Sequence, residues 1–159
     1  MTRRVSEGGC ACGAIRYALT SGPMVVHCCH CADCQTETGS AFVINAVIES
    51  DRVTLLAGAP DYVLTPSASG KGQEIARCPT CRVALWSHYA GSGRKSSFVR
   101  AGTLDDPGAV PPDVHIFTRS KLAWVVLPDG VPAFEAFYSS SEGVWSDAGR
   151  ARWKALLAA

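Results

Sequence analysis

The 159-residue sequence predicts an all-β domain with few short helices and one helix near its C-terminal end. Short segments rich in β-branched and aromatic residues recur along the chain. Turn sequences that combine glycine, proline, serine or aspartate separate many of these segments, as at residues 21–23 and 106–108. A chain of this length with 47% hydrophobic content can bury one core, so we expect residues 1–159 to form a single domain.

The strands expected from this pattern are short and follow one another closely. Only two helices are expected. One is a short turn that follows Cys31 and ends at Gly39, and the other spans about residues 147–157 with Ser146 as its N-cap. Residues 1–6 are expected to be loose. The expected strands are residues 14–19, 41–48, 52–56, 62–65, 97–101, 114–117 and 123–127.

Seven of the eight cysteines fall into three tight clusters, a spacing typical of metal ligands. A disulfide framework is the alternative, but such frameworks belong to small secreted chains. The chain begins MTRRVSEGGC and shows no segment like a signal sequence, so we expect a cytoplasmic protein with reduced thiols that are free to bind zinc. The clusters are Cys10 and Cys12, then Cys29, Cys31 and Cys34, then Cys78 and Cys81.

An odd number of clustered cysteines predicts two zinc sites of different kinds. A zinc ion with four cysteine ligands is closed and supports the fold, whereas one with three keeps a position open for a small molecule. The two paired clusters fit a structural site that joins segments roughly 70 residues apart. The three-cysteine cluster is local, so it can form an open site on one loop. The expected structural ligands are Cys10, Cys12, Cys78 and Cys81, and the expected catalytic-zinc ligands are Cys29, Cys31 and Cys34.

Three thiolates limit the chemistry of the open zinc ion. Each thiolate donates charge, so this zinc is a weaker Lewis acid than one bound by neutral histidines and is less suited to making hydroxide from water. It favours a soft fourth ligand such as a thiol, which stays nucleophilic toward a small aldehyde beside it. The predicted reaction class is thiol addition to a carbonyl group, or its reversal by carbon–sulfur cleavage.

Charge and hydropathy argue against nucleic acid and membrane as partners. Fifteen basic and fourteen acidic side chains give a formal net charge of +1, and the basic residues are spread thinly instead of clustering as phosphate contacts require. The longest uninterrupted apolar run, residues 122–127, is far shorter than the roughly 20 residues that span a bilayer.

Several motifs occur in a fixed order between residues 7 and 137, the expected core of the domain. They are GCACGAIRY at 9–17, CHCADC at 29–34, TGSAF at 38–42, CPTC at 78–81, GTLDDP at 102–107 and HIF at 115–117. Their ordered occurrence is highly specific. On these residues the chain resembles the glutathione-dependent formaldehyde-activating enzymes, also called the Gfa or centromere-protein-V-like family.

The resemblance implies an all-β, Mss4-like fold with two zinc ions per chain, one structural and one catalytic, on the ligand sets given above. It also implies an enzyme of the carbon–sulfur lyase class that condenses formaldehyde with glutathione to S-hydroxymethylglutathione. The implied partners are glutathione or another small thiol and a small aldehyde. Arg82 stands where the family usually has a glycine, which predicts a differently shaped turn after Cys81.

Two alternatives stay open at this point. The domain is either an enzyme or a non-catalytic, zinc-stabilised binding module of the same fold. Cys28 adjoins Cys29 and adds a fourth candidate to the local ligand set, although we expect it to be a buried small hydrophobe. We expect His30 to face backbone or solvent, and His115 to be a satisfied core histidine. Four aromatic residues are expected in the core and not at a ligand: Trp86, Trp124, Phe134 and Phe137.

Overall fold

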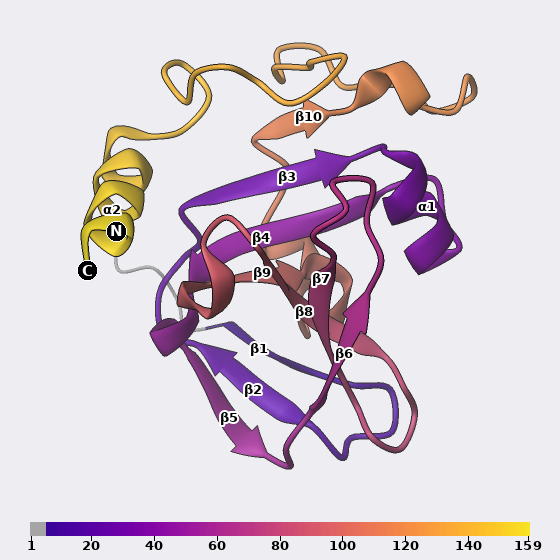
Figure 1. Cartoon of the computed structure of the whole chain (residues 1–159), viewed down its shortest axis with the longest axis vertical. Helices are drawn as coiled ribbons and strands as arrows, with labels where there is room; N and C mark the ends of the chain where they lie inside the picture. The colour runs from indigo at the N-terminus through magenta and orange to yellow at the C-terminus, as the bar shows by residue number, and fades with distance from the viewer. Residues whose placement is uncertain (1–5) are drawn as a thin grey trace.

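The computed structural model describes residues 6–159, and within that range ten strands form two sheets (Figure 1). The smaller sheet has the order β1-β2-β5, and the larger has the order β10-β3-β4-β9-β8-β7-β6. β10 runs parallel to β3, whereas β3 and β4 pair antiparallel. The strands are β1 Ser6–Gly9, β2 Arg16–Leu19, β3 Val25–Cys29, β4 Val43–Glu49, β5 Val53–Ala57, β6 Asp61–Thr65, β7 Gln73–Arg77, β8 Ala84–Tyr89, β9 Ser96–Arg100 and β10 Val114–Ile116.

Both helices form where the sequence predicts them. Helix α1 (Ala32–Thr38) has Cys31 as its N-cap and ends at Gly39, whose φ of 66° is the left-handed conformation that glycine adopts readily. Helix α2 (Asp147–Ala158) begins after Ser146, whose hydroxyl accepts a hydrogen bond from Gly149 N at 3.1 Å. The described residues contain no helix long and apolar enough to cross a membrane. Short 3₁₀ turns lie at Ser50–Arg52, Gly93–Lys95, Ala101–Thr103, Pro107–Ala109 and Thr118–Ser120.

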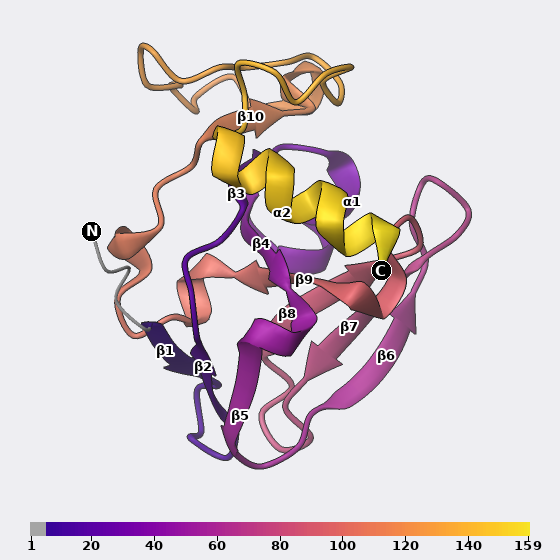
Figure 2. The same ribbon diagram turned by 90° about the vertical axis from the view of Figure 1, so that its left-hand side faces the viewer.

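The central strands of the larger sheet are buried on both faces, and the side chains of β4 show how. Val43 and Val47 pack in a core cluster that also contains Tyr138, from the C-terminal segment. The intervening Ala46 points to the opposite face, into a second cluster between the two sheets. Figures 1 and 2 together show the smaller sheet below and the segment after β10 above, with α2 crossing beside β3 and β4. The prediction of an all-β domain with few short helices and a C-terminal helix is confirmed.

An ion pair fixes α2 against the rest of the chain. Arg152 Nε donates to Glu49 Oε1 at 2.8 Å, and the same guanidinium donates to the Gly22 carbonyl at 2.9 Å. Burial opposes ionisation of Glu49, but its bonds to Arg152 outweigh burial, so the pKa of Glu49 lies below its usual value. A Cβ at Gly149 would lie 2.4 Å from the Met24 carbonyl oxygen, so the helix approaches the backbone closely there. These contacts hold Trp153, the neighbour of Arg152, next to the sheet.

One predicted strand is wrong, and four observed strands were not predicted. Residues 123–127 pair with no strand; instead Lys121 Nζ donates to the carbonyls of Leu122 and Val125, which folds the segment into a turn. β1, β3, β7 and β8 escaped prediction because glycine, cysteine, histidine or charged residues interrupt their β-branched pattern. Ser6, expected to be loose, begins β1, and residues 1–5 lie outside the described residues.

Candidate functional site

The four-cysteine cluster joins two turns that are far apart in the sequence. Cys10 and Cys12 lie between β1 and β2, and Cys78 and Cys81 lie between β7 and β8. All four sulfur atoms lie within 4.8 Å of one another, with 3.6 Å between Cys10 and Cys12 and 3.7 Å between Cys12 and Cys78. Tetrahedral zinc with Zn–S bonds of about 2.3 Å requires sulfur–sulfur distances of about 3.8 Å. The cluster therefore has the size of a closed four-thiolate site.

Backbone N–H groups support the charge of these sulfur atoms. Ile15 N donates to Cys10 Sγ at 3.2 Å, and Cys81 N donates to Cys78 Sγ at 3.5 Å. A bond from Val83 N, the largest contribution, lowers the pKa of Cys81 to about 6. Hydrogen bonds of this kind orient metal-binding thiolates and stabilise their charge.

Arg82 follows the last cysteine of this cluster, where we expected a differently shaped turn. Its φ of 65° lies in the left-handed region that glycine adopts without strain and that costs another residue about 1–2 kcal/mol. Arg82 N donates to the Cys78 carbonyl at 3.0 Å, which closes the turn, and its guanidinium pairs with Asp61 at 3.1 Å. The turn thus has, at Arg82, a backbone conformation that suits glycine.

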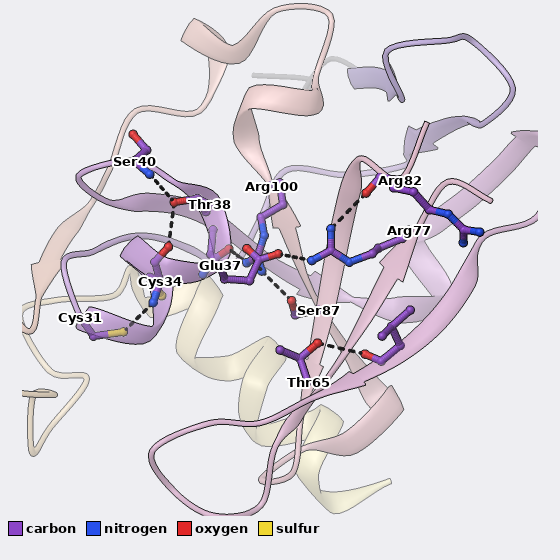
Figure 3. Close-up of polar contacts among 12 residues, drawn as sticks. Cys31, Cys34, Glu37, Thr38, Ser40, Thr65, Arg77, Arg82, Ser87 and Arg100 are labelled. Carbon is purple, nitrogen blue, oxygen red and sulfur yellow. Dashed lines mark hydrogen bonds and ion pairs between the residues drawn. The ribbon is translucent and has the colours of Figure 1, made fainter. Parts of the chain in front are cut away.

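The three-cysteine cluster is built on the end of a strand and the start of a helix. Cys29 is the last residue of β3, Cys31 is the N-cap of α1, and Cys34 lies in the first turn of α1. Their sulfur atoms lie within 4.8 Å of one another, and Cys34 N donates to Cys31 Sγ at 3.3 Å (Figure 3). The structure therefore gathers these three thiols into one group and leaves Cys28 outside it.

These three thiols need a positive charge before all of them can ionise. The hydrogen bonds from Cys29 and Cys34 lower the pKa of Cys31 to about 2, and the bond to Cys31 raises the pKa of Cys29 to about 12. Hydrogen bonds to Cys29 and Cys31, together with burial, also raise the pKa of Cys34. The isolated cluster thus holds one thiolate near neutral pH, and a divalent cation would let the other two thiols deprotonate. A soft, thiolate-rich donor set fits zinc.

Cys28 lies on the opposite face of β3, in a third group with His30 and His115. His30 Nε2 lies 3.0 Å from His115 Nδ1 and 3.6 Å from Cys28 Sγ. Burial lowers the pKa of both histidines, that of His30 to about 4, and raises the pKa of Cys28 to about 12, so all three are neutral near pH 7. Cys28 is buried as expected, whereas His30 bonds to His115 instead of to backbone or solvent.

A cavity of about 500 Å³ lies against the three-cysteine cluster, whose residues form part of its wall. His27 also lines it, since residues two apart on a strand share a face and His27 lies two before Cys29. The four-cysteine cluster does not line this cavity; Cys81 contacts a different one, of about 540 Å³. Phenyl, phenol and indole rings make up much of the wall: Tyr89, Phe98, Phe117, Phe137, Trp145 and Trp153.

Polar groups gather around α1, next to the three thiols. The Asp33 carboxylate accepts a hydrogen bond from Ala68 N at 2.7 Å and so holds the loop of residues 67–69 at the cavity. Gln35 Nε2 donates to the Ser120 carbonyl at 2.9 Å. Arg119 is the one lysine or arginine among the described residues that line the cavity. Its guanidinium lies 5.7 Å from the centre of the Phe117 ring. It makes no ion pair with a described residue. The cavity therefore offers one cation to a substrate.

A buried ion-pair network fixes α1 to the larger sheet (Figure 3). The Glu37 carboxylate lies 2.6 Å from Arg77 and 3.7 Å from Arg100, and the Glu37 and Arg100 side chains are only 7% and 8% exposed. Arg100 also donates to Ser87 Oγ at 2.8 Å. Arg77 donates in turn to the carbonyl of Arg82, in the turn of the four-cysteine cluster. The network thus connects the helix that carries Cys34 with the other cysteine cluster.

We expect Glu37→Gln to lower the free energy of unfolding by about 3 kcal/mol, because it leaves the Arg100 charge buried without a carboxylate. Urea denaturation at pH 7 measures this change. Glu74→Gln is the matched control, since Glu74 forms an exposed pair with Arg94 whose loss should change the free energy of unfolding far less. Equal losses in the two variants would show that the buried network does not hold α1.

The sequence did not predict that aromatic rings line the cavity. We call these rings, Tyr89, Phe98, Phe117, Phe137, Trp145 and Trp153, the aromatic wall. Phe137 and Trp124 were expected in the core, but they are 53% and 72% exposed, and Phe137 lines the cavity; both expectations are wrong. Trp86 and Phe134 pack in the core clusters as expected. A signal for the wall exists in the composition, because five of the thirteen aromatic residues fall within residues 134–153, beyond the last motif.

His27 was also missed, and hydrogen bonds connect it to this wall. Trp145 Nε1 donates to the Tyr138 hydroxyl at 2.6 Å, which leaves that hydroxyl free to donate to His27 Nε2 at 2.7 Å. Burial lowers the pKa of His27 to about 4, so its ring is neutral near pH 7. A lone histidine in an apolar strand gives no sequence signal for such a network.

Comparison with protein families gives one match that covers most of the chain. The family model described as glutathione-dependent formaldehyde-activating enzyme matches residues 5–120. All seven clustered cysteines lie within the matched region. The match ends before Phe137, Trp145 and Trp153.

Two curated relatives carry the same description, in both cases marked as provisional. One, from Halomonas elongata, is 28% identical over 128 residues, which cover 76% of this chain and 80% of the relative. The other, from Talaromyces marneffei, is 25% identical over 135 residues, which cover 82% of this chain and 71% of the relative. Among solved structures, the crystal structure of a Rhodobacter sphaeroides protein aligns with a TM-score of 0.45 and 18% identity, covering 62% of this chain and 87% of that one.

Proposed function

Because the chain belongs to the family of glutathione-dependent formaldehyde-activating enzymes, we propose that it joins a small thiol such as glutathione to a small aldehyde such as formaldehyde, or cleaves that adduct. It would then be a carbon–sulfur lyase related to S-(hydroxymethyl)glutathione synthase. One observation carries the proposal: three convergent thiols, Cys29, Cys31 and Cys34, form part of the wall of a cavity of about 500 Å³. The thiol-rich site suits a reducing compartment, and we infer that the enzyme acts in the cytoplasm.

We assign different roles to the two cysteine clusters. Cys10, Cys12, Cys78 and Cys81 would hold a structural zinc ion that ties the start of the domain to the turn after β7. Cys29, Cys31 and Cys34 would hold the catalytic zinc ion, which gives two zinc ions per chain. Zinc bound by three thiolates supplies a fourth position that accepts the sulfur of a thiol substrate and keeps that sulfur ionised and nucleophilic.

The reaction needs no redox partner. The sulfur of the thiol forms a bond to the aldehyde carbon, the carbonyl π bond breaks, and the proton lost by the thiol ends on the new hydroxyl group. The fixed position of α1 keeps the thiols at the wall of the cavity. Arg119 lies in the cavity wall without a carboxylate partner among the described residues, so it can bind a carboxylate of glutathione.

The proposal is tested by the rate at which glutathione and formaldehyde exchange with their adduct. Exchange nuclear magnetic resonance with ¹³C-formaldehyde measures this rate at equilibrium. We expect the zinc-loaded protein to raise the exchange rate in proportion to its concentration, above the spontaneous rate. No acceleration, with no effect of glutathione on the metal site, would overturn the enzymatic assignment for this substrate pair.

The rival function is a non-catalytic binding module of the same fold. It predicts that glutathione or a protein partner binds without any acceleration of exchange. Absorption of the cobalt-substituted protein distinguishes the two, because binding of a fourth sulfur ligand changes the sulfur-to-cobalt charge-transfer band whether or not catalysis follows. A changed band with an unchanged exchange rate would support the binding module.

A further inference from the structure

The cavity beside Cys29 is more aromatic than glutathione and formaldehyde require, since neither of them carries an aromatic ring. It measures about 500 Å³, within the range of sites that hold whole drug-sized ligands. Six aromatic side chains and the His27 ring line it. Phe137 remains 53% exposed, which leaves a ring face free for a ligand.

The polar and aromatic parts of the wall lie in different directions from Cys29. Asp33 and Gln35 hold residues 67–69 and Ser120 around α1, which follows Cys29 in the chain. Two of the rings, those of Phe137 and Trp145, lie beside His27, which precedes Cys29 by two residues on β3. Phe137 lies 5.6 Å and Trp145 lies 6.5 Å from the His27 ring, measured between ring centres. A residue spacing of about 3.3 Å along a strand puts His27 roughly 7 Å from Cys29 at the backbone.

Three of the six rings of the aromatic wall come from a segment that the family match does not include. Phe137, Trp145 and Trp153 lie beyond residue 120, where the match ends. Trp145 and Trp153 pack against each other with ring centres 5.7 Å apart, and the Arg152 contacts with Glu49 and Gly22 hold the helix that carries Trp153. The matched region thus supplies the thiols and three of the rings, and the segment after it supplies the other three rings.

We propose that the carbonyl substrate of this protein is an aromatic aldehyde, whose ring lies against Phe137, Trp145 and Trp153 while its carbonyl carbon faces the three-cysteine cluster. The inference rests on the proposed function and specifies its substrate. The polar side of the cavity, near α1 and Arg119, takes the thiol. The product is a hemithioacetal: the thiol sulfur bonds to the aldehyde carbon, the π bond opens, and the thiol proton ends on the hydroxyl oxygen.

Binding of the ring is tested first, without any chemistry. Benzyl alcohol serves as the probe because it carries the ring but no electrophile, and ligand-observed nuclear magnetic resonance titration of the zinc-loaded full-length protein gives its Kd. We expect saturable binding that Phe137→Ala and Trp153→Ala each weaken roughly tenfold, since each removes a ring-stacking surface. Trp124→Ala is the matched control, because Trp124 is 72% exposed and does not line the cavity; it should leave Kd unchanged.

Catalysis is tested second, through the ratio of kcat/KM for benzaldehyde to kcat/KM for formaldehyde with glutathione as the thiol. We expect the ratio to fall about tenfold in Trp153→Ala and to stay constant in Trp124→Ala. Phe137→Ala repeats the test at an exposed position that should not affect folding. If formaldehyde reacts but benzyl alcohol does not bind and benzaldehyde is not used, the aromatic assignment is overturned and the proposed function stands.

Two further outcomes are decisive. Saturable ring binding that depends on Phe137, with no catalysis of either aldehyde, supports the aromatic site and overturns the proposed reaction. Packing of the rings against a second copy of the chain is the competing explanation. Light scattering that shows a dimer in the native protein and a monomer in Phe137→Ala, without a change in Kd for benzyl alcohol, overturns the aromatic-substrate assignment.

Discussion

Cys78→Ser is expected to unfold most of the protein at 25 °C. Cys78 is 0% exposed and belongs to the cluster that joins residue 10 to residue 81. Apparent binding energies of structural zinc are about 10–16 kcal/mol, and the loss of one of four thiolates should remove several kcal/mol from a total stability of about 5–15 kcal/mol. Circular dichroism and the dispersion of amide resonances measure the folded fraction, and elemental analysis measures the zinc content of the same samples.

Cys28→Ser is the control for this prediction. Cys28 is equally buried but lies outside both clusters that we assign to zinc, so its replacement buries a hydroxyl group without removing a metal ligand. We expect this variant to stay folded and to lose about 1–3 kcal/mol. If Cys28→Ser unfolds the chain as fully as Cys78→Ser, burial and not metal binding explains the effect.

Cys34→Ser is expected to leave the protein folded, to release one of its two zinc ions and to reduce adduct exchange by at least about 100-fold. Its three-cysteine cluster spans only six residues and ties no distant parts of the chain together, so its metal contributes little to folding. Zinc content, the urea denaturation curve and the exchange rate of the glutathione adduct test the three parts of this prediction.

The comparison of Cys34→Ser with Cys78→Ser tests the division of roles between the clusters. Equal destabilisation by the two substitutions would contradict it. So would a Cys34→Ser variant that keeps both zinc ions and full exchange activity, because the open site would then lie elsewhere.

The pairing of the cysteines could be predicted from the sequence because metal ligands impose strong local rules. A C-x-C or C-x-x-C turn brings two sulfurs to one side, and four such sulfurs can converge only if the sheet brings the two turns together. The structure places Cys10 and Cys12 beside Cys78 and Cys81 and groups Cys29, Cys31 and Cys34, as expected from spacing. Spacing alone could not show that Cys28 lies outside the three-cysteine cluster. Its position follows from the alternation of side chains along β3, a strand that was not predicted.

The aromatic wall could not be predicted, because it depends on contacts between distant residues. Trp153 lies at the cavity on a helix that Arg152 holds to Glu49, 103 residues earlier in the chain. Apolar sequence alone does not distinguish a buried ring from one that lines a cavity, and this is why the expectation for Phe137 failed. The run of residues 123–127 has a strand-like composition, but no strand lies beside it to accept its hydrogen bonds.

The central claim is that one metal site is closed by four cysteines and the other keeps a position open at the cavity. Anomalous diffraction on either side of the zinc absorption edge, from crystals grown with glutathione, tests it most directly. The account predicts two zinc peaks per chain: one at about 2.3 Å from the sulfurs of residues 10, 12, 78 and 81, and one at the same distance from the sulfurs of residues 29, 31 and 34 and from a glutathione sulfur. A disulfide among residues 29, 31 and 34, or no zinc there in metal-replete protein, would contradict it.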